Sequence, residues 1–251
     1  MSKASNSSRA NSSGVNSSGA NYPRPDLSRL ERQLSYTFKN TGLLTEALTH
    51  RSAGSKNNER LEFLGDSILN FVIAADLFLR YPQYAEGDLS RIRASLVNNE
   101  GLFMVSGQLK LGDYLVLGSG ELKSGGYRRN SILADTVEAI FGAVFMESGF
   151  EMCRDLILRL YHEQLENIPD ADSLKDPKTR LQELLQSRKL ALPEYTVIEV
   201  LGKSHNQQFK MRCEIKQLQL TSQGQGSNRR KAEQQAAAEI FIQLQNKLEK
   251  K

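Results

Sequence analysis

Residues 57–70 (NNERLEFLGDSILN) place three acidic side chains on one face of an expected helix. Glu59, Glu62 and Asp66 are spaced i, i+3, i+7, so at about 100° per residue they share an arc of roughly 60°. A different arc is apolar and faces the expected core: Leu61, Leu64, Ile68, Phe71 and Val72. Carboxylates this close repel one another, which predicts a divalent cation between them. For Glu59 a place near the start of the helix, with Asn58 as its cap, explains the residue about equally well.

Two other residues of this stretch fit neither arc. Gly65 lies in mid-helix, where glycine costs about 1 kcal/mol relative to alanine, so it predicts the close approach of another backbone or of a ligand. Phe63 points away from the apolar arc, which favours an interface with a second chain. A single exposed phenylalanine is the simpler alternative.

A second acidic helix is expected at Ser131–Ser148. Asp135 and Glu138 lie beside the small residues Ala139 and Gly142, opposite an apolar face formed by Leu133, Val137, Ile140, Phe141 and Val144. Small residues allow another helix to approach, and packing against the first acidic helix would bring four carboxylates together. Such an oxygen-rich site suits Mg²⁺ or Mn²⁺. The alternative is that both acidic faces are merely solvated.

The charge distribution separates the two ends of the chain. Residues 171–251 hold 15 Lys and Arg against 9 Asp and Glu, whereas residues 1–170 hold 18 against 20. A basic tail behind a mildly acidic body favours a polyanionic partner for the tail. The two cysteines lie far apart, which predicts neither a disulfide framework nor a zinc site. Without a long apolar run or an apolar leader, we expect no membrane association and a cytoplasmic location.

The remaining body of the chain reads as helices. A Ser/Asn-rich extension (residues 1–25) is expected to be disordered. Helical patterns follow at 26–49, with a break at 40–42, and at 58–81, 89–97 and 150–166, whereas the glycine-rich residues 111–126 suggest a loop. His50, between the first two helical patterns, is more readily a structural hydrogen-bonding residue than a catalyst.

The tail reads as helix, strands, helix. The first helix is expected at 178–187, with strands at 195–200 and 209–215, a third strand at 218–221 and a turn at 224–228. Arg229, Arg230 and Lys231 then open a long helix, where cations oppose the helix dipole. A bound phosphate backbone would explain that inverted charge, and a solvated basic run is the alternative.

Several of these motifs closely resemble bacterial ribonuclease III. They are NERLEFLGDS at 58–67, GELKSGG at 120–126 and LADTVEA at 133–139. The tail resembles the double-stranded-RNA-binding domain of that family, through DPKTRLQELLQ at 176–186, GKSHNQQF at 202–209 and GSNRRKAEQQAA at 226–237. The likeness runs from about residue 27 to residue 248 in the family's domain order.

The resemblance implies an all-α endonuclease domain at 26–168, a linker at 169–176 and a small α+β (α-β-β-β-α) double-stranded-RNA-binding domain at 177–248. It also implies a homodimer, with the aromatic Phe63 entering a socket on the partner subunit. Glu62, Asp66, Asp135 and Glu138 match the family's metal-binding acids, with Asp66 and Glu138 as the catalytic pair. Glu59 and Glu86 match supporting acids.

In the tail, the resemblance implies that Gln182 and His205 contact the minor groove of duplex RNA. Asn228, Arg229 and Arg230 match phosphate contacts across the major groove. The family often has Ser and Lys at these three positions, and the present residues keep the donors and the charges.

The activity implied is Mg²⁺-dependent hydrolysis of double-stranded RNA to 5′-phosphate and 3′-hydroxyl ends, acting on ribosomal RNA precursors and structured transcripts. Two alternatives stay open at this point. One is a non-catalytic duplex-RNA-binding regulator, which metal-dependent cleavage would distinguish. The other is a di-iron oxidoreductase, although that class uses Glu-x-x-His pairs and neither acidic motif contains a histidine.

Overall fold

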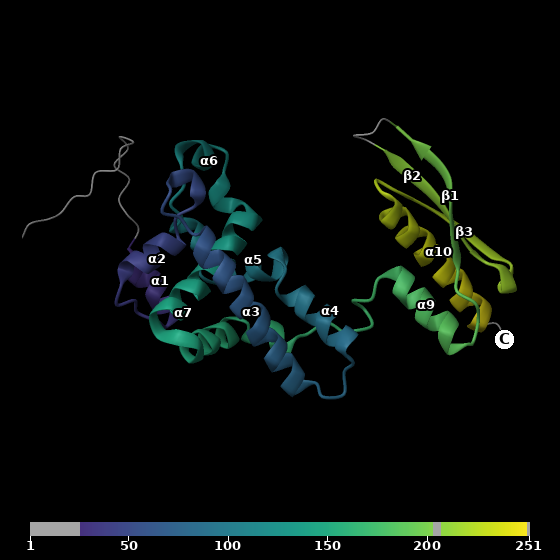
Figure 1. The fold of residues 1–251 in the computed structure, drawn as a ribbon, viewed down its shortest axis with the longest axis horizontal. Helices are drawn as coiled ribbons and strands as arrows, with labels where there is room; N and C mark the ends of the chain where they lie inside the picture. Colours follow the sequence, from purple (N-terminus) through teal and green to yellow (C-terminus); the bar gives the residue numbers. More distant parts are fainter. Residues whose placement is uncertain (1–25, 203–206, 250–251) are drawn as a thin grey trace, which may run out of the picture.

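The computed structural model describes residues 26–202 and 207–249. Two bodies are visible in Figure 1, a helical one and a smaller one with a three-stranded sheet, and residues 167–176 connect them. Each has its own hydrophobic core. Among the described residues, no helix is both long enough and apolar enough to cross a membrane. The all-α and α+β fold classes expected from the sequence are confirmed.

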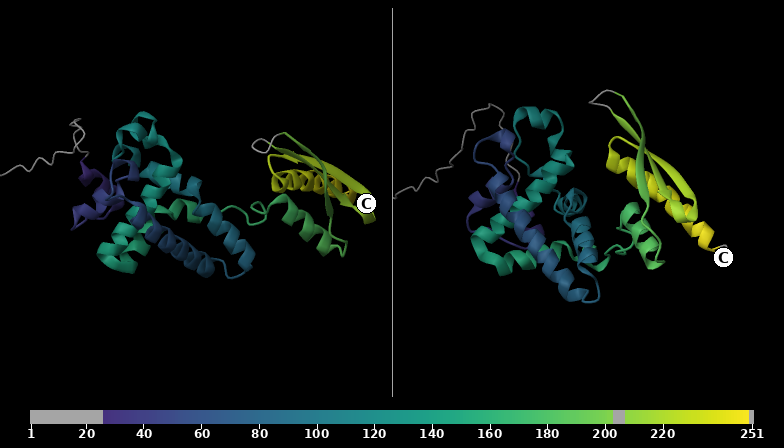
Figure 2. Two further views of the ribbon diagram at one scale, coloured as in Figure 1. Left: turned by 45° about the horizontal axis from the view of Figure 1, so that its top comes forward. Right: turned by 45° about the vertical axis from the view of Figure 1, so that its right-hand side comes forward.

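The helical body is built around two long helices, α3 and α7 (Figure 2). Its elements are α1 (Leu27–Leu34), α2 (Thr41–Ala47), η1 (Arg51–Ala53), α3 (Glu59–Arg80), α4 (Glu86–Leu96), α5 (Asn99–Gln108), η2 (Leu111–Asp113), α6 (Ser119–Lys123), η3 (Gly126–Arg128), α7 (Asn130–Leu160) and α8 (His162–Glu166). Side-chain oxygens of Asp26, Asn40 and Asn98 accept backbone N–H groups at the first turns of α1, α2 and α5. These caps fix where the three helices begin.

The backbones of α3 and α7 touch at two glycines. A Cβ atom placed on Gly65 would lie 1.8 Å from the carbonyl oxygen of Glu138, and one placed on Gly142 would lie 2.2 Å from the carbonyl oxygen of Leu61. Neither position has room for a methyl group. The close backbone approach expected from Gly65 is therefore confirmed, and it brings the acidic residues of the two helices to one place.

Helix α7 contains a sharp bend at Gly149, where φ is 77° and ψ is −174°. The sequence predicts two helices with a break near this residue, and the structure confirms this, because the non-helical backbone of Gly149 separates two helical segments of α7. A positive φ is available to glycine at little cost. The apolar face of the first half, from Leu133 to Val144, is buried as expected.

Two expectations for the helical body are wrong. Phe71 was assigned to the core stripe of α3, but its side chain is 61% exposed and meets the Phe150 ring edge-on at 5.7 Å. Residues 111–126 are not a simple loop, because η2 and α6 lie within them and η3 begins at their end. Gly126 allows this compact path, since a Cβ atom there would lie 2.7 Å from Cγ of Glu121.

The smaller body has the order helix, three strands, helix. Its elements are α9 (Pro177–Ser187), β1 (Glu194–Leu201), β2 (Gln208–Ile215), η4 (Lys216–Leu218), β3 (Leu220–Gly226) and α10 (Arg229–Glu249). The strands form an antiparallel sheet in the order β1-β2-β3, and the β1–β2 register shifts between Val197 and Glu199. One face of the sheet packs against both helices in a core that includes Leu181, Leu185, Cys213, Ile215 and Ile240.

The third strand differs from its expected place. It runs to Gly226 and so includes residues that the sequence assigned to a turn. A Cβ atom on Gly224 would lie 2.3 Å from backbone atoms of Ala232 and Ala236. The glycine therefore marks the close packing of α10 on the strand.

Candidate active site

Three carboxylates meet where α3 and α7 cross. Oxygen atoms of Glu62, Asp135 and Glu138 all lie within 4.8 Å of one another. Asp66, one turn further along α3, is exposed and accepts a hydrogen bond of 2.8 Å from the side-chain amide of Asn70. Its charge nevertheless acts on Glu138. The structure thus brings three of the four expected acids into one group and puts the fourth beside it.

The carboxylates in this group repel one another. Burial, followed by the charges of Asp66, Glu62 and Asp135, raises the pKa of Glu138 to about 8. Burial is also the main cause that raises the pKa of Glu62 and of Asp135. Several half-buried carboxylates with raised pKa values are stabilised when a cation binds among them. An all-oxygen donor set of this kind fits Mg²⁺ or Mn²⁺.

A cleft of about 510 Å³ opens beside the acids. It is lined by Glu62, Asp135, Glu59, His50, Arg51, Ser52, Asn58, Glu121, Arg129, Ser131 and Ile132. Arg51 pairs with Glu59 at 3.5 Å, and Arg129 pairs with Glu121 at 2.8 Å. The cleft therefore combines an acidic wall with two guanidinium groups, which suits a phosphate bound through a cation.

On the basic side of the cleft, the sequence indicates Arg129 as a possible phosphate contact, and Arg51 was missed. Arg51 belongs to the LTHRS segment directly before the acidic stretch, and its position beside an acid-rich motif was the available signal. The segment is held to a distant loop, because the His50 N–H donates to the carbonyl of Val116 and the Gly118 N–H donates to Oγ of Ser52. Contacts between segments this far apart in the chain are not readable from local pattern.

His50 makes structural hydrogen bonds, as expected. Its Nδ1 atom accepts the backbone N–H of Ser52 at 3.2 Å and lies 2.8 Å from the Ser52 hydroxyl. The residue also lines the cleft, as Asp135 does. His50 therefore helps to build the wall of the cleft next to the acids.

The capping role expected for Asn58 belongs to its neighbour. Oδ1 of Asn57 accepts the backbone N–H of Glu59 at 3.1 Å, whereas the Asn58 side chain makes no capping bond. Asn58 is only 2% exposed. The backbone at this position is already helical, with φ −79° and ψ −13°, whereas a capping side chain requires an extended backbone.

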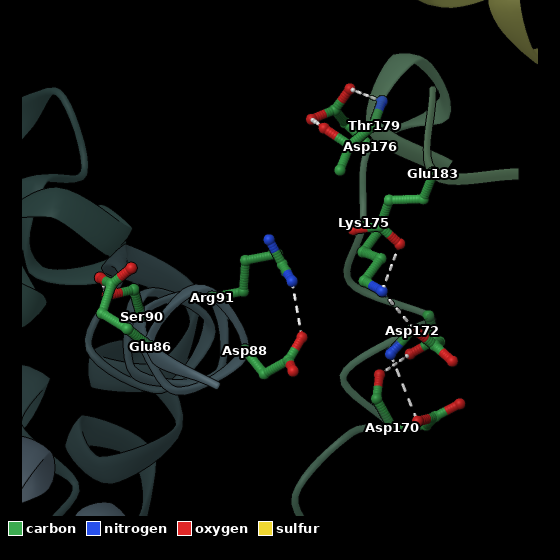
Figure 3. A network of polar contacts seen from close by, with 11 residues as sticks. Glu86, Asp88, Ser90, Arg91, Asp170, Asp172, Lys175, Asp176, Thr179 and Glu183 are labelled. Carbon is green, nitrogen blue, oxygen red and sulfur yellow. Dashed lines mark hydrogen bonds and ion pairs between the residues drawn. The ribbon is translucent and has the colours of Figure 1, made fainter. Parts of the chain in front are cut away.

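Glu86 lies apart from the three clustered acids. It is the first residue of α4, and its carboxylate accepts a hydrogen bond of 2.7 Å from the Ser90 hydroxyl. Figure 3 shows Asp88 and Arg91 of the same helix turned toward the segment that leads into α9, where Lys175 bridges Asp172 and Glu183. Within one copy of the chain, Glu86 is therefore not part of the carboxylate group.

Phe63 is strongly exposed, at 76%, although it stands between two of the acids on α3. Phe71 and Phe78 on the same helix are 61% and 68% exposed. At about 100° per residue these three aromatic side chains share an arc of roughly 80°. They form an exposed apolar band along α3, which favours a contact with another chain.

The expected RNA-contacting residues lie on the smaller body. Gln182 is exposed on α9, and Arg229 and Arg230 are exposed in the first turn of α10. Oδ1 of Asn228 accepts the backbone N–H of Lys231 at 2.9 Å, so Asn228 caps that helix. His205 lies outside the described residues, as does the Ser/Asn-rich extension.

Comparison with known proteins agrees with this arrangement. Residues 40–165 match the family described as Ribonuclease-III-like, and residues 177–244 match the double-stranded RNA binding motif. Ribonuclease 3 of Vibrio cholerae is 54% identical over 222 residues, which are 88% of this chain and 99% of that protein. The chain belongs to the ribonuclease III family. Ribonuclease 3 of Photobacterium profundum is similarly close, at 56% identity over 87% of this chain and 98% of that protein.

Solved structures of ribonuclease III resemble the helical body. The nuclease domain of the Campylobacter jejuni protein is 43% identical, with a TM-score of 0.55, and covers 57% of this chain and all of that one. The description of that structure refers to a region involved in dimer formation. A second structure of the same nuclease domain gives the same TM-score and covers 58% of this chain.

Proposed function

We propose that the chain is a double-strand-specific endoribonuclease that hydrolyses phosphodiester bonds beside Glu62, Asp66, Asp135 and Glu138. The observation that carries the proposal is the group of three carboxylates within 4.8 Å at the α3–α7 crossing. It occurs in a chain of the ribonuclease III family that also matches a double-stranded RNA binding motif.

The proposed cofactor is Mg²⁺, with Mn²⁺ as a substitute. When bound, such a cation acts as a Lewis acid toward a phosphoryl oxygen and makes water a nucleophile at neutral pH. The four acids supply the oxygen ligands, with Asp66 and Glu138 as the catalytic pair. Arg51 and Arg129 line the adjoining cleft and offset the charge of the RNA backbone. The products carry 5′-phosphate and 3′-hydroxyl ends.

The proposed RNA-binding domain spans 177–248, after an endonuclease domain at 26–168 and a linker at 169–176. Gln182, together with His205 outside the described residues, contacts the minor groove. Asn228, Arg229 and Arg230 contact phosphates, and the exposure of both arginines at the start of α10 supports this role. Recognition of this kind depends on A-form shape and 2′-hydroxyl groups rather than on base sequence.

The chain acts as a homodimer through its endonuclease domain. The exposed apolar band on α3 and the dimer-forming region named for the Campylobacter jejuni relative support this assembly. Phe63 enters the partner subunit, and Glu59 and Glu86 act as supporting acids of the assembled site. We place the enzyme in the cytoplasm, where ribosomal RNA precursors and structured transcripts are its substrates.

Cleavage of a perfect RNA duplex, with and without Mg²⁺ and with the product ends mapped, tests the function. Metal-dependent scission to 5′-phosphate ends is expected. Glu138→Ala and Asp66→Asn should abolish scission while duplex binding persists. A chain that binds duplex RNA but leaves it intact in Mg²⁺ would instead be a non-catalytic regulator.

A further inference from the structure

Asn58 lies at the acidic end of the cleft, and its side-chain amide group is buried without a hydrogen-bond partner for its nitrogen in the described part of the chain. The residue is 2% exposed and lines the cleft together with Glu62 and Asp135. Among the described residues, its Nδ2 atom is buried and has no hydrogen-bond partner. A buried amide donor without a partner is destabilising, so its presence needs an explanation.

Two backbone hydrogen bonds fix the position of Asn58 at the start of α3. The Asn58 N–H donates to the carbonyl of Thr49, and the Asn58 carbonyl accepts the N–H of Glu62, each at 2.9 Å. Residues four apart on a helix share one face, so the amide lies on the face of α3 that carries Glu62. The capping bond at the helix start is made by Asn57 and therefore does not occupy Asn58.

The Glu62 carboxylate lies close to Asp135 and Glu138, and among the described residues no hydrogen bond to it is present. Carboxylates that hold a metal ion are commonly oriented by a hydrogen bond to an oxygen that faces away from the ion. A fixed amide N–H group next to Glu62 and Asp135 is a suitable donor.

We propose that Asn58 is a positioning residue whose side-chain amide donates a hydrogen bond to Glu62 or Asp135 when these carboxylates hold the divalent cation. This inference rests on the proposed metal site and adds to it a residue that is not itself a ligand. Loss of such an orienting contact typically weakens metal binding by about 10-fold to 100-fold.

The test measures Mn²⁺ binding to the full-length protein by calorimetry, without RNA, in parallel with the Mg²⁺ dependence of duplex cleavage. Asn58→Leu replaces the amide by methyl groups on the same branched frame, and Asn58→Ala removes it without adding bulk. Both should weaken Mn²⁺ binding by about 10-fold or more and shift the Mg²⁺ midpoint of cleavage upward by a similar factor. The melting temperature of Asn58→Leu should equal or exceed that of the wild type, because a buried unpaired amide is lost.

Asn57→Ala is the matched control, since it removes the capping bond one residue away. It should lower the melting temperature and leave Mn²⁺ affinity unchanged. Glu138→Gln checks the site itself and should abolish Mn²⁺ binding. If Glu138→Gln abolishes binding but both Asn58 variants bind Mn²⁺ like the wild type, the role of Asn58 is overturned. Mn²⁺ binding that survives Glu138→Gln would overturn the proposed metal site, and the role of Asn58 with it.

Discussion

Among the clustered carboxyl groups, that of Glu138 is the least easily ionised. Burial and three neighbouring carboxylates raise its pKa from 4.5 to about 8. In the metal-free protein the folded state therefore keeps a proton that the unfolded chain has already released. The contribution of Glu138 to the free energy of unfolding is therefore greatest below the unfolded pKa and falls as the pH rises from about 5 to 8. A cation bound among the carboxylates reverses this trend.

Replacing Glu138 by glutamine is expected to raise the melting temperature at pH 8 in EDTA, because the neutral amide avoids the cost of ionisation. A chain of this size gains roughly 2–4 °C per kcal/mol. The same variant should lose the stabilisation that Mn²⁺ gives the wild type. Thermal melting monitored by circular dichroism at pH 5 and pH 8 measures both effects.

Glu147 on the same helix is the control, because its pKa is shifted in the opposite direction. Its carboxylate accepts hydrogen bonds from the Tyr36 hydroxyl and from the backbone of Asn40, and its pKa is lowered mainly by the Tyr36 bond. Glu147→Gln should therefore lower the melting temperature at pH 8. If Glu138→Gln melted at or below the wild-type temperature at that pH, the ionisation penalty assigned to Glu138 would be wrong.

At the scale of elements, the crossing of α3 and α7 fixes the acidic group. Gly65→Ala puts a methyl group 1.8 Å from the Glu138 carbonyl oxygen and must separate the two backbones. The free energy of unfolding should fall by about 3 kcal/mol or more, because separating the two backbones disrupts the packing between the helices. Urea denaturation measures this change.

Gly107→Ala is the matched control for that experiment. Gly107 lies on α5 and is exposed, with nothing within 4 Å of an added Cβ atom. Alanine there should stabilise the chain by roughly 0.5–1 kcal/mol through helix propensity. Equal effects of the two substitutions would mean that the helix crossing is looser than described.

The first turn of α10 is the element expected to meet RNA phosphates. Arg229→Ala should weaken binding to all duplex sequences alike and reduce the slope of log affinity against log salt concentration by about 1. Arg212→Ala makes the same charge change on β2, where Met211 and Cys213 on either side face the core and Arg212 is exposed. It should leave the salt slope unchanged. Fluorescence anisotropy with two unrelated duplexes measures both, and a loss confined to one sequence would contradict backbone recognition.

The sequence pattern predicted the long helices, in which a regular apolar spacing extends over many residues. The core faces of α7 and the contact glycine of α3 follow directly from spacing, and so does the meeting of Glu62 with Asp135 and Glu138. Phe71 and β3 were misassigned because neighbouring elements, rather than local pattern, decide what covers an apolar side chain or pairs with a strand. Arg51 joins the cleft through a contact between segments far apart in the chain, which periodicity within one segment does not predict.

At the scale of the whole molecule, assembly depends on the exposed face of α3. Phe63→Glu puts a charge on the proposed dimer contact and should yield monomers in multi-angle light scattering. Ile242→Glu, an equally drastic change at an exposed apolar residue of α10, should keep the wild-type mass. A Phe63→Glu protein that stays dimeric would assign the contact to other residues.

The open edge of the sheet at β1 affects whether the concentrated protein aggregates. Among the residues that the structure describes, strand β1 pairs only with β2, and it exposes Val197, Ile198, Val200 and Leu201. A regular apolar edge is a template on which further chains add as strands and build aggregates. The register shift leaves Ile198 out of the ladder and bends the strand, which interrupts that template. One irregular residue in β1 therefore helps to keep separate molecules from joining edge to edge.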